Sequence, residues 1–191
     1  MTAEQQTQLQ EKRVQLQIRI RFKEFLKEYI TSFLEILDEF QNLEIEYRVL
    51  SFRCIPEEFH DLLRENLQIK ALVKYQLAQV EITAEDLRFA AILEKYPSAN
   101  PFRYVLDAPV GYNSQPGEVL QEIMKTHRIS EEIVVICWLK YAFLLEININ
   151  DLAQKTNTGI INTWHGDTII FPKDYRWLIA YSLEDEWRFK S

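Results

Sequence analysis

The chain has 191 residues, of which 47% are hydrophobic and 13% aromatic, and it contains only four glycines. A chain of this size and composition can bury a full core without disulfides, so it predicts one compact domain and argues against long disordered stretches. The net charge of −7 opposes a general affinity for nucleic acid or anionic lipid, because both present dense negative charge.

No Gly or Pro occurs before Pro56, so nothing in the first 55 residues favours a turn. Apolar residues recur at spacings of three and four from Val14 to Phe40, as they do on one face of a helix. We therefore predict a single helix over residues 4–41. Residues 14–22 also alternate apolar and polar side chains, so a strand followed by a helix is the alternative.

The predicted helix would extend about 57 Å, which is more than a domain of this size can cover with its own core. Its large side chains from Phe22 to Phe40 are expected to pack on the domain. Four smaller apolar residues would then lie on the exposed half and mediate two-fold self-association, namely Val14, Leu16, Ile18 and Ile20. In the alternative, the N-terminal residues fray and residues 16–22 pack locally.

The middle of the chain predicts one strand and several helices. Residues 43–52 alternate apolar and charged side chains and include β-branched and aromatic residues, as in a half-buried strand. Pro56 followed by two acids, and Thr83 followed by Glu85 and Asp86, are typical helix starts. We predict helices over residues 56–67, 69–80 and 83–96.

Residues 98–117 contain three prolines and two glycines, which predict a loop, a short strand at residues 104–106 and a second loop. This segment is the predicted boundary between a mainly helical part, residues 1–97, and a mixed part, residues 98–191, of one compact domain. A further helix is expected over residues 118–126.

The apolar run from Ile133 to Ile147 shows neither the helical period nor the strand period. Ser130, Glu131 and Glu132 precede it and are typical of a helix start. Because the run is also long for a strand, we favour a buried helix.

The C-terminal part carries the strongest β signal. Short runs rich in β-branched and aromatic residues alternate with turn sequences such as Pro172-Lys173-Asp174. We predict sequential antiparallel hairpins built from residues 159–164, 168–171, 175–182 and 186–189. The expected fold class is α+β, in which an N-terminal helical part packs with a C-terminal antiparallel meander.

No motif for a common cofactor or metal is present in the sequence. None of the four glycines lies in a phosphate-cradling pattern, and no Cys-x-x-Cys or His-Glu-x-x-His occurs. Cys54, His60, His127 and Cys137 have spacings that match no compact zinc site, and both cysteines lie in apolar runs typical of buried free thiols. We therefore predict no cofactor and no metal.

The most noticeable titratable pair is His165 with Asp167, beside Trp164 in a predicted hairpin turn. From such a turn the pair could face a cleft and serve an enzyme. Residues of this type in a turn more often serve the backbone geometry, which is the interpretation that we favour.

Aromatic residues gather near the C-terminus. Tyr175, Trp177, Ile179 and Tyr181 share one face of a predicted strand, which favours a role in the core. In the alternative, Tyr175, Trp177 and Tyr181 form a binding surface together with Trp187, because Trp and Tyr are enriched in binding hot spots.

Residues 149–157, with the sequence INDLAQKTN, resemble the first helix of a repressor-type helix-turn-helix, particularly at Leu152, Ala153 and Thr156. Residues 160–164 resemble its recognition helix. The resemblance implies DNA binding through residues 149–164. The hairpin predicted for the second half of this segment is the alternative.

The leading functional hypothesis is a non-enzymatic protein-interaction or regulatory module whose protein partner is unidentified. An enzyme that uses His165 and Asp167 is the first alternative, and a DNA-binding regulator is the second. The N-terminal sequence lacks the apolar segment of a secretory signal, and no apolar run reaches the length of a bilayer span. We therefore expect a cytoplasmic protein without a membrane partner, and we expect no nucleic-acid partner because the chain is acidic.

Overall fold

The computed structural model describes residues 2–52, 55–67, 69–82, 87–95, 111–112, 116–141, 143–156, 167–181 and 186–191. The strands in these residues are β1 (Tyr47–Phe52), β2 (Glu81–Ile82), β3 (Gly111–Tyr112), β4 (Ile133–Trp138), β5 (Phe143–Asn148), β6 (Thr168–Phe171), β7 (Leu178–Tyr181) and β8 (Glu186–Lys190). They form one sheet in the order β2-β1-β5-β4-β6-β7-β8-β3. Only β1 and β2 pair in parallel among these strands, and all other neighbours are antiparallel.

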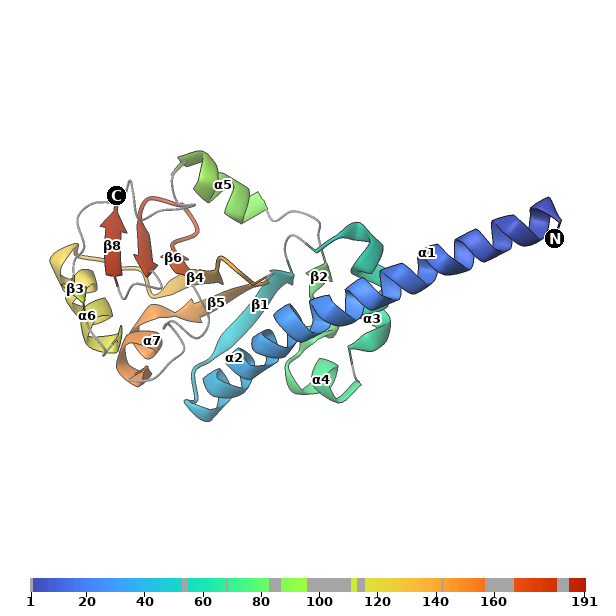
Figure 1. Cartoon of the computed structure of the whole chain (residues 1–191). Helices are drawn as coiled ribbons and strands as arrows, with labels where there is room; N and C mark the ends of the chain where they lie inside the picture. The colour runs from blue at the N-terminus through green and yellow to red at the C-terminus, as the bar shows by residue number, and fades with distance from the viewer. Residues whose placement is uncertain are drawn as a thin grey trace.

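The helices in the same residues are α1 (Ala3–Phe25), α2 (Thr31–Asn42), α3 (His60–Asn66), α4 (Ile69–Lys74), α5 (Leu87–Lys95), α6 (Pro116–Thr126) and α7 (Ile149–Lys155). A π-helical turn, η1 (Leu26–Ile30), joins α1 to α2, and η2 (Glu57–Phe59) and η3 (Leu77–Gln79) are 3-10 turns. Figure 1 shows α1, η1 and α2 as one rod whose N-terminal end projects from the rest of the protein. The predicted α+β class is therefore confirmed. None of the helices in the described ranges is both long and apolar enough to cross a membrane.

The long N-terminal helix predicted from the sequence is confirmed, and the strand alternative for residues 14–22 is wrong. The helix starts at a capping box, in which the Thr2 hydroxyl accepts from the Gln5 N–H at 3.3 Å and the Thr2 N–H donates to Gln5 Oε1 at 2.9 Å. It ends where Glu44 takes a left-handed backbone, with φ of 54°, and the Ile45 N–H donates to the Phe40 carbonyl at 2.9 Å. Glu44 stands where a Gly is usual, so the sequence does not mark this end.

The other helices largely follow the predictions. The helix predicted at 56–67 is found as η2 and α3, the one at 69–80 as α4 and η3, and the one at 118–126 as α6. α5 begins at Leu87, and the predicted cap at Thr83 lies outside the described residues. The predicted boundary near residue 98 and the strand at 104–106 also lie outside them.

The buried helix predicted for Ile133 to Ile147 is wrong, because this run forms the antiparallel hairpin of β4 and β5. Both strands lie at the centre of the sheet, with helices over both faces: Val134 and Ile136 face one core cluster, and Val135 and Cys137 face the other. A strand covered on both faces loses the apolar and polar alternation by which strands are recognised. Two features of the sequence fit the observed hairpin: Lys140 lies in the turn, and the run begins with β-branched residues.

The two faces of the sheet pack against different helices. The larger core cluster joins the sheet to α2, α3, α6 and α7, and the smaller one joins the opposite face to α5 through Ile92 and Phe89. Among the described helices, α5 thus lies on one face of the sheet and α2, α3, α6 and α7 lie on the other. The predicted hairpins of β6, β7 and β8 are confirmed by their antiparallel pairing.

The C-terminal aromatic residues are part of these cores. Trp177 is 4% exposed, and Tyr181 and Trp187 are also buried, so the rings do not form an open binding surface. The predicted stripe is wrong at Tyr175. This residue lies in the turn before β7, with φ of 56°, and packs on Phe171 at the opposite face of the sheet. The left-handed backbone at this position breaks the alternation that the sequence pattern assumes.

We expect Trp177→Ala to lower the free energy of unfolding by about 3 to 5 kcal/mol, because the substitution removes a buried indole and leaves a cavity. The Trp177 indole also donates to Glu131 Oε2 at 3.3 Å. Trp177→Phe keeps an aromatic ring in the core and should cost less. Urea denaturation measures both values, and a Trp177→Ala protein as stable as the wild type would contradict the core assignment.

Candidate functional site

Strand β1 has an outer edge that is only partly paired. Its inner side pairs with β5 from Tyr47 to Val49 and again at Ser51 and Phe52, with a bulge at Leu50, but its outer side pairs with β2 only at Ser51 and Phe52. No other described strand adjoins the outer side of Tyr47–Leu50. Alternate residues of a strand direct their N–H and C=O groups to opposite sides, so this stretch presents backbone donors and acceptors outward.

Within the described residues, this edge has no partner strand because the chain before β2 turns away from it. If β2 continued backwards in the same register, Val80 would lie beside Leu50 and Gln79 beside Val49. Residues 77–79 instead form the 3-10 turn η3, which follows a left-handed Gln76 with φ of 55°. A 3-10 turn cannot supply the extended backbone of a strand, so a cleft of about 720 Å³ separates this segment from β1.

The described residues that line this cleft, which we call the β1 cleft, come from α2, the edge of β1, the segment from α4 to β2, and α5. They are Gln41, Ile45, Glu46, Tyr47, Arg48, Val49, Leu50, Lys74, Tyr75, Gln76, Gln79, Val80 and Arg88. Three of these side chains are cationic and one is a carboxylate. Cations therefore outnumber carboxylates among the described lining residues, although the whole chain is acidic.

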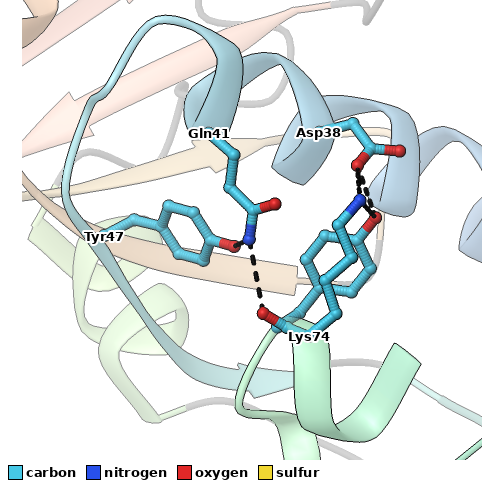
Figure 2. Close-up of polar contacts among 5 residues, drawn as sticks. Asp38, Gln41, Tyr47 and Lys74 are labelled. Atoms are coloured by element: carbon cyan, nitrogen blue, oxygen red, sulfur yellow. Dashed lines mark hydrogen bonds and ion pairs between the residues drawn. The ribbon is translucent and has the colours of Figure 1, made fainter. Parts of the chain in front are cut away.

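A polar cluster fixes the wall of the β1 cleft that α4 provides (Figure 2). The Tyr75 hydroxyl donates to Asp38 Oδ1 at 2.6 Å, and the Lys74 ammonium contacts the same carboxylate oxygen. Lys74 Nζ also donates to the Tyr75 hydroxyl oxygen at 2.9 Å. Because Asp38 belongs to α2, these contacts tie the end of α4 to the long helix.

Gln41 connects that cluster to the strand. Its side-chain amide donates to the Tyr47 hydroxyl oxygen at 3.1 Å and to the Lys74 carbonyl at 3.3 Å (Figure 2). The Gln41 amide therefore links α2 to both β1 and α4 on this side of the β1 cleft. This arrangement holds the phenol of Tyr47 in place along the edge of the strand.

The charges of this cluster suit binding better than catalysis. The Lys74 ammonium, followed by the Tyr75 hydroxyl, holds the pKa of Asp38 below its ordinary value of 3.8. The Asp38 carboxylate raises the pKa of Lys74. Burial raises the pKa of Tyr47 and of Tyr75. At neutral pH the cluster thus contains a carboxylate, an ammonium and two neutral phenols, and none of these pKa values is shifted in the direction that makes a nucleophile or a base.

A second charged group lies on the α5 side of β1. Glu146 of β5 forms ion pairs with Arg48 at 2.9 Å and with Lys173 at 2.6 Å. Burial raises the pKa of Glu146, but the hydrogen bonds from Lys173 and Arg48 outweigh it, so the pKa lies below the ordinary value. Arg48 and Arg88 line both the β1 cleft and a smaller cavity of about 130 Å³ beside Glu146, so the two adjoin each other.

Of the predicted catalytic pair, only Asp167 belongs to the described residues, and it does not line this cleft. His165 lies outside the described residues, and Asp167 is not among the residues that line either cavity. The Asp167 carbonyl accepts from the Leu139 N–H at 2.8 Å, which is a backbone role in the turn before β6. Asp174 is exposed and pairs with Arg176.

The four residues weighed as zinc ligands have other surroundings where they are described. His60 contacts the Ile55 carbonyl at 3.0 Å, His127 stacks on Phe189 with ring centres 3.7 Å apart, and Cys137 is a buried free thiol. Cys54 lies outside the described residues. Within the described ranges, no three His, Cys, Asp or Glu side chains are grouped so that they could hold a metal ion.

The first helix of the helix-turn-helix resemblance is present as α7, with Asn148 as its cap. Leu152 and Ala153 are buried against the core, and Thr156 follows the helix. Residues 157–166, which would include the recognition helix or the competing hairpin, lie outside the described residues. DNA binding through residues 149–164 therefore stays a prediction.

The projecting part of α1 is a second candidate surface. Phe22 and Phe25 are the first rings packed on the domain, where they contact Phe59 with ring centres 5.5 and 5.4 Å apart. Residues 4–17 expose their side chains. The projection expected from the helix length is therefore confirmed, whereas self-association through it is untested.

The apolar residues of this projection fall on two faces rather than one. Val14 and Ile18 continue the stripe that faces the core, and Ile18 packs against it. Leu16, which is 60% exposed, and Ile20 lie on the opposite face of the helix, in line with Leu9 at spacings of seven and four. Three cations flank this outer row, namely Lys12, Arg13 and Lys23.

Searches against protein-family models, curated proteins and solved structures found no match to this chain. The functional argument therefore rests on the site itself. Sequence reasoning did not find the β1 cleft, because its lining residues are spread over four segments and form no motif. The only local signal is a charged residue, Arg48, in the middle of a predicted strand.

We expect Asp38→Asn to lower stability near neutral pH, because Asp38 ties α4 to α2. The pKa of Asp38 is lower in the folded protein than its ordinary value of 3.8. Its contribution is therefore fully present above that value and disappears as the pH falls through the folded pKa. The difference in unfolding free energy between wild type and Asp38→Asn should vanish in strong acid. Asp61→Asn, at an exposed pair with Arg64, is the control and should change stability little at any pH.

If α1 mediates self-association, we expect the outer row to carry it. Leu16→Gln combined with Ile20→Gln should abolish the dimer, whereas Val14→Gln on the opposite face should leave it unchanged. The flanking cations would meet like charges across a two-fold axis, so the dimer should become more populated as salt screens them. Light scattering at tens of micromolar provides the measurement. A monomer at every salt concentration would remove the hypothesis.

Proposed function

We propose that this protein is a non-enzymatic protein-interaction module that binds an extended segment of a partner as an added strand along β1. The observation that carries the proposal is the outer edge of Tyr47–Leu50, which faces a cleft of about 720 Å³ and has no strand beside it among the described residues. Strand addition uses such an edge because its backbone groups supply hydrogen bonds to any extended chain. The four residues of the edge correspond to about 13 Å of extended backbone.

The form of the cleft supports a peptide rather than a compact small molecule. Its residues lie on both faces of β1, with Tyr47 and Val49 on the α2 side and Arg48 and Leu50 on the α5 side. A strand inserted at the edge would continue the sheet and send alternate side chains to these two sides. Small-molecule sites are usually enclosed and mostly apolar, whereas this cleft runs along a sheet edge and is rich in polar side chains.

The chemistry of the cleft supports binding without catalysis. Asp38 and Lys74 hold each other in their charged forms, and the two phenols stay neutral. Such groups offer stable donors, acceptors and ring faces to a partner. The proposal includes a cytoplasmic location, which the free thiol of the buried Cys137 fits.

A short peptide that alternates Val and Gln tests strand addition, because it offers an extended backbone without charge. Its binding should protect those backbone amides of Tyr47–Leu50 that point away from β5 from hydrogen exchange, as followed by NMR. The same peptide with a central Pro is the matched control, because Pro removes a backbone donor and the strand geometry, and it should bind about tenfold more weakly.

Two results would contradict the proposal. One is that the Val–Gln and Pro-containing peptides bind equally well. The other is that protection appears elsewhere on the protein while the amides of the β1 edge stay unprotected.

A further inference from the structure

The two sides of the β1 cleft differ in charge, and this difference bears on which segment can bind. On the α2 side, the ammonium of Lys74 is already matched by Asp38. Tyr47 and Val49 are half-buried there and pack against the larger core cluster. A side chain of an added strand on this side would lie beside an aromatic ring and a β-branched residue, which are favourable neighbours for another apolar side chain.

On the α5 side, one carboxylate serves two cations. Glu146 is 15% exposed and pairs with both Arg48 and Lys173, whose side chains are 66% and 63% exposed. The pKa of Glu146 lies below its ordinary value because Lys173 and Arg48 outweigh its burial, so it remains ionised at neutral pH. The group therefore carries one positive charge that Glu146 does not balance. Arg88, which donates to the Ser51 hydroxyl oxygen at 3.2 Å, adds a third cation to the lining.

An added strand would place alternate side chains beside Arg48. Laterally adjacent residues of neighbouring strands stand about 5 Å apart on the same face, and opposite charges at that position stabilise the pair. Arg48 can keep its bond to Glu146 and still donate to a second carboxylate, because a guanidinium has five N–H donors. Among the described residues that line the β1 cleft, Glu46 is the one carboxylate, against the three cations Arg48, Lys74 and Arg88.

Resting on the strand addition proposed above, we propose that the bound segment alternates apolar and acidic residues, with its acidic side chains on the α5 side beside Arg48 and its apolar side chains beside Tyr47 and Val49. The sheet edge selects an extended backbone. The charge difference between the two sides selects the alternation and fixes which side chains point each way.

Three peptides of equal length distinguish the preference for acidic residues from strand addition itself. In these peptides Val alternates with Glu, with Gln or with Lys. Isothermal titration should rank them Glu, Gln, Lys in order of decreasing affinity. The Glu peptide should bind about tenfold more tightly than the Gln peptide, as expected for one charge-assisted hydrogen bond. The advantage of the Glu peptide should shrink as salt is added.

Two protein variants locate the effect. Arg48→Gln should remove the advantage of the Glu peptide while leaving the affinity for the Gln peptide unchanged. Lys173→Gln should also reduce the advantage of the Glu peptide. Arg48 would then be the only one of the two cations that still pairs with Glu146, so the group would carry no unbalanced positive charge. Arg64→Gln, on the exposed surface of α3, is the matched control and should leave the ranking as in the wild type.

Each outcome decides one of the two proposals. Equal binding of the Glu and Gln peptides, or an advantage that survives Arg48→Gln, overturns the acidic alternation and leaves strand addition standing. Failure of all three peptides to protect the amides of the β1 edge overturns strand addition, and the alternation with it.

Discussion

The packing of Phe33 against the sheet is the interaction on which the rest of the structure depends. Its ring lies 4.9 Å from Phe52 of β1 and 4.4 Å from Phe143 of β5, so one side chain of α2 holds two neighbouring strands. Aromatic pairs at these distances add attraction beyond the area that they bury. The register of β1 on β5, and with it the position of the open edge, is thereby set relative to the long helix.

That position explains why the cleft has such different walls. Because α2 lies along β1, its polar side chains Asp38 and Gln41 reach the edge and fasten α4 and Tyr47 there. On the opposite face, α5 is the helix found in the described residues, and Arg48 and Lys173 lie exposed around Glu146. The described part of the α2 side is therefore neutral, whereas the described part of the α5 side is cationic.

Protonation states that do not change near neutral pH are consistent with this use of the cleft. A binding surface benefits from fixed donors and charges, whereas general acid-base catalysis needs a group whose pKa lies near the working pH. The shifts at Asp38 and Glu146 lead away from that range, since both carboxyls are held in the ionised form. The described groups of the cleft thus match what the proposed interaction requires.

The sequence by itself determined the long helix and the C-terminal hairpins, because their signals are local. The stripe from Val14 to Phe40, without Gly or Pro, specifies a helix whatever it packs against, and Thr2 and Gln5 supply its cap. Tertiary structure alone decided that residues 133–147 form two strands, because burial on both faces removes the alternation. It also decided the β1 cleft, since an open edge depends on where η3 turns and on which distant residues, such as Asp38 and Lys74, meet there.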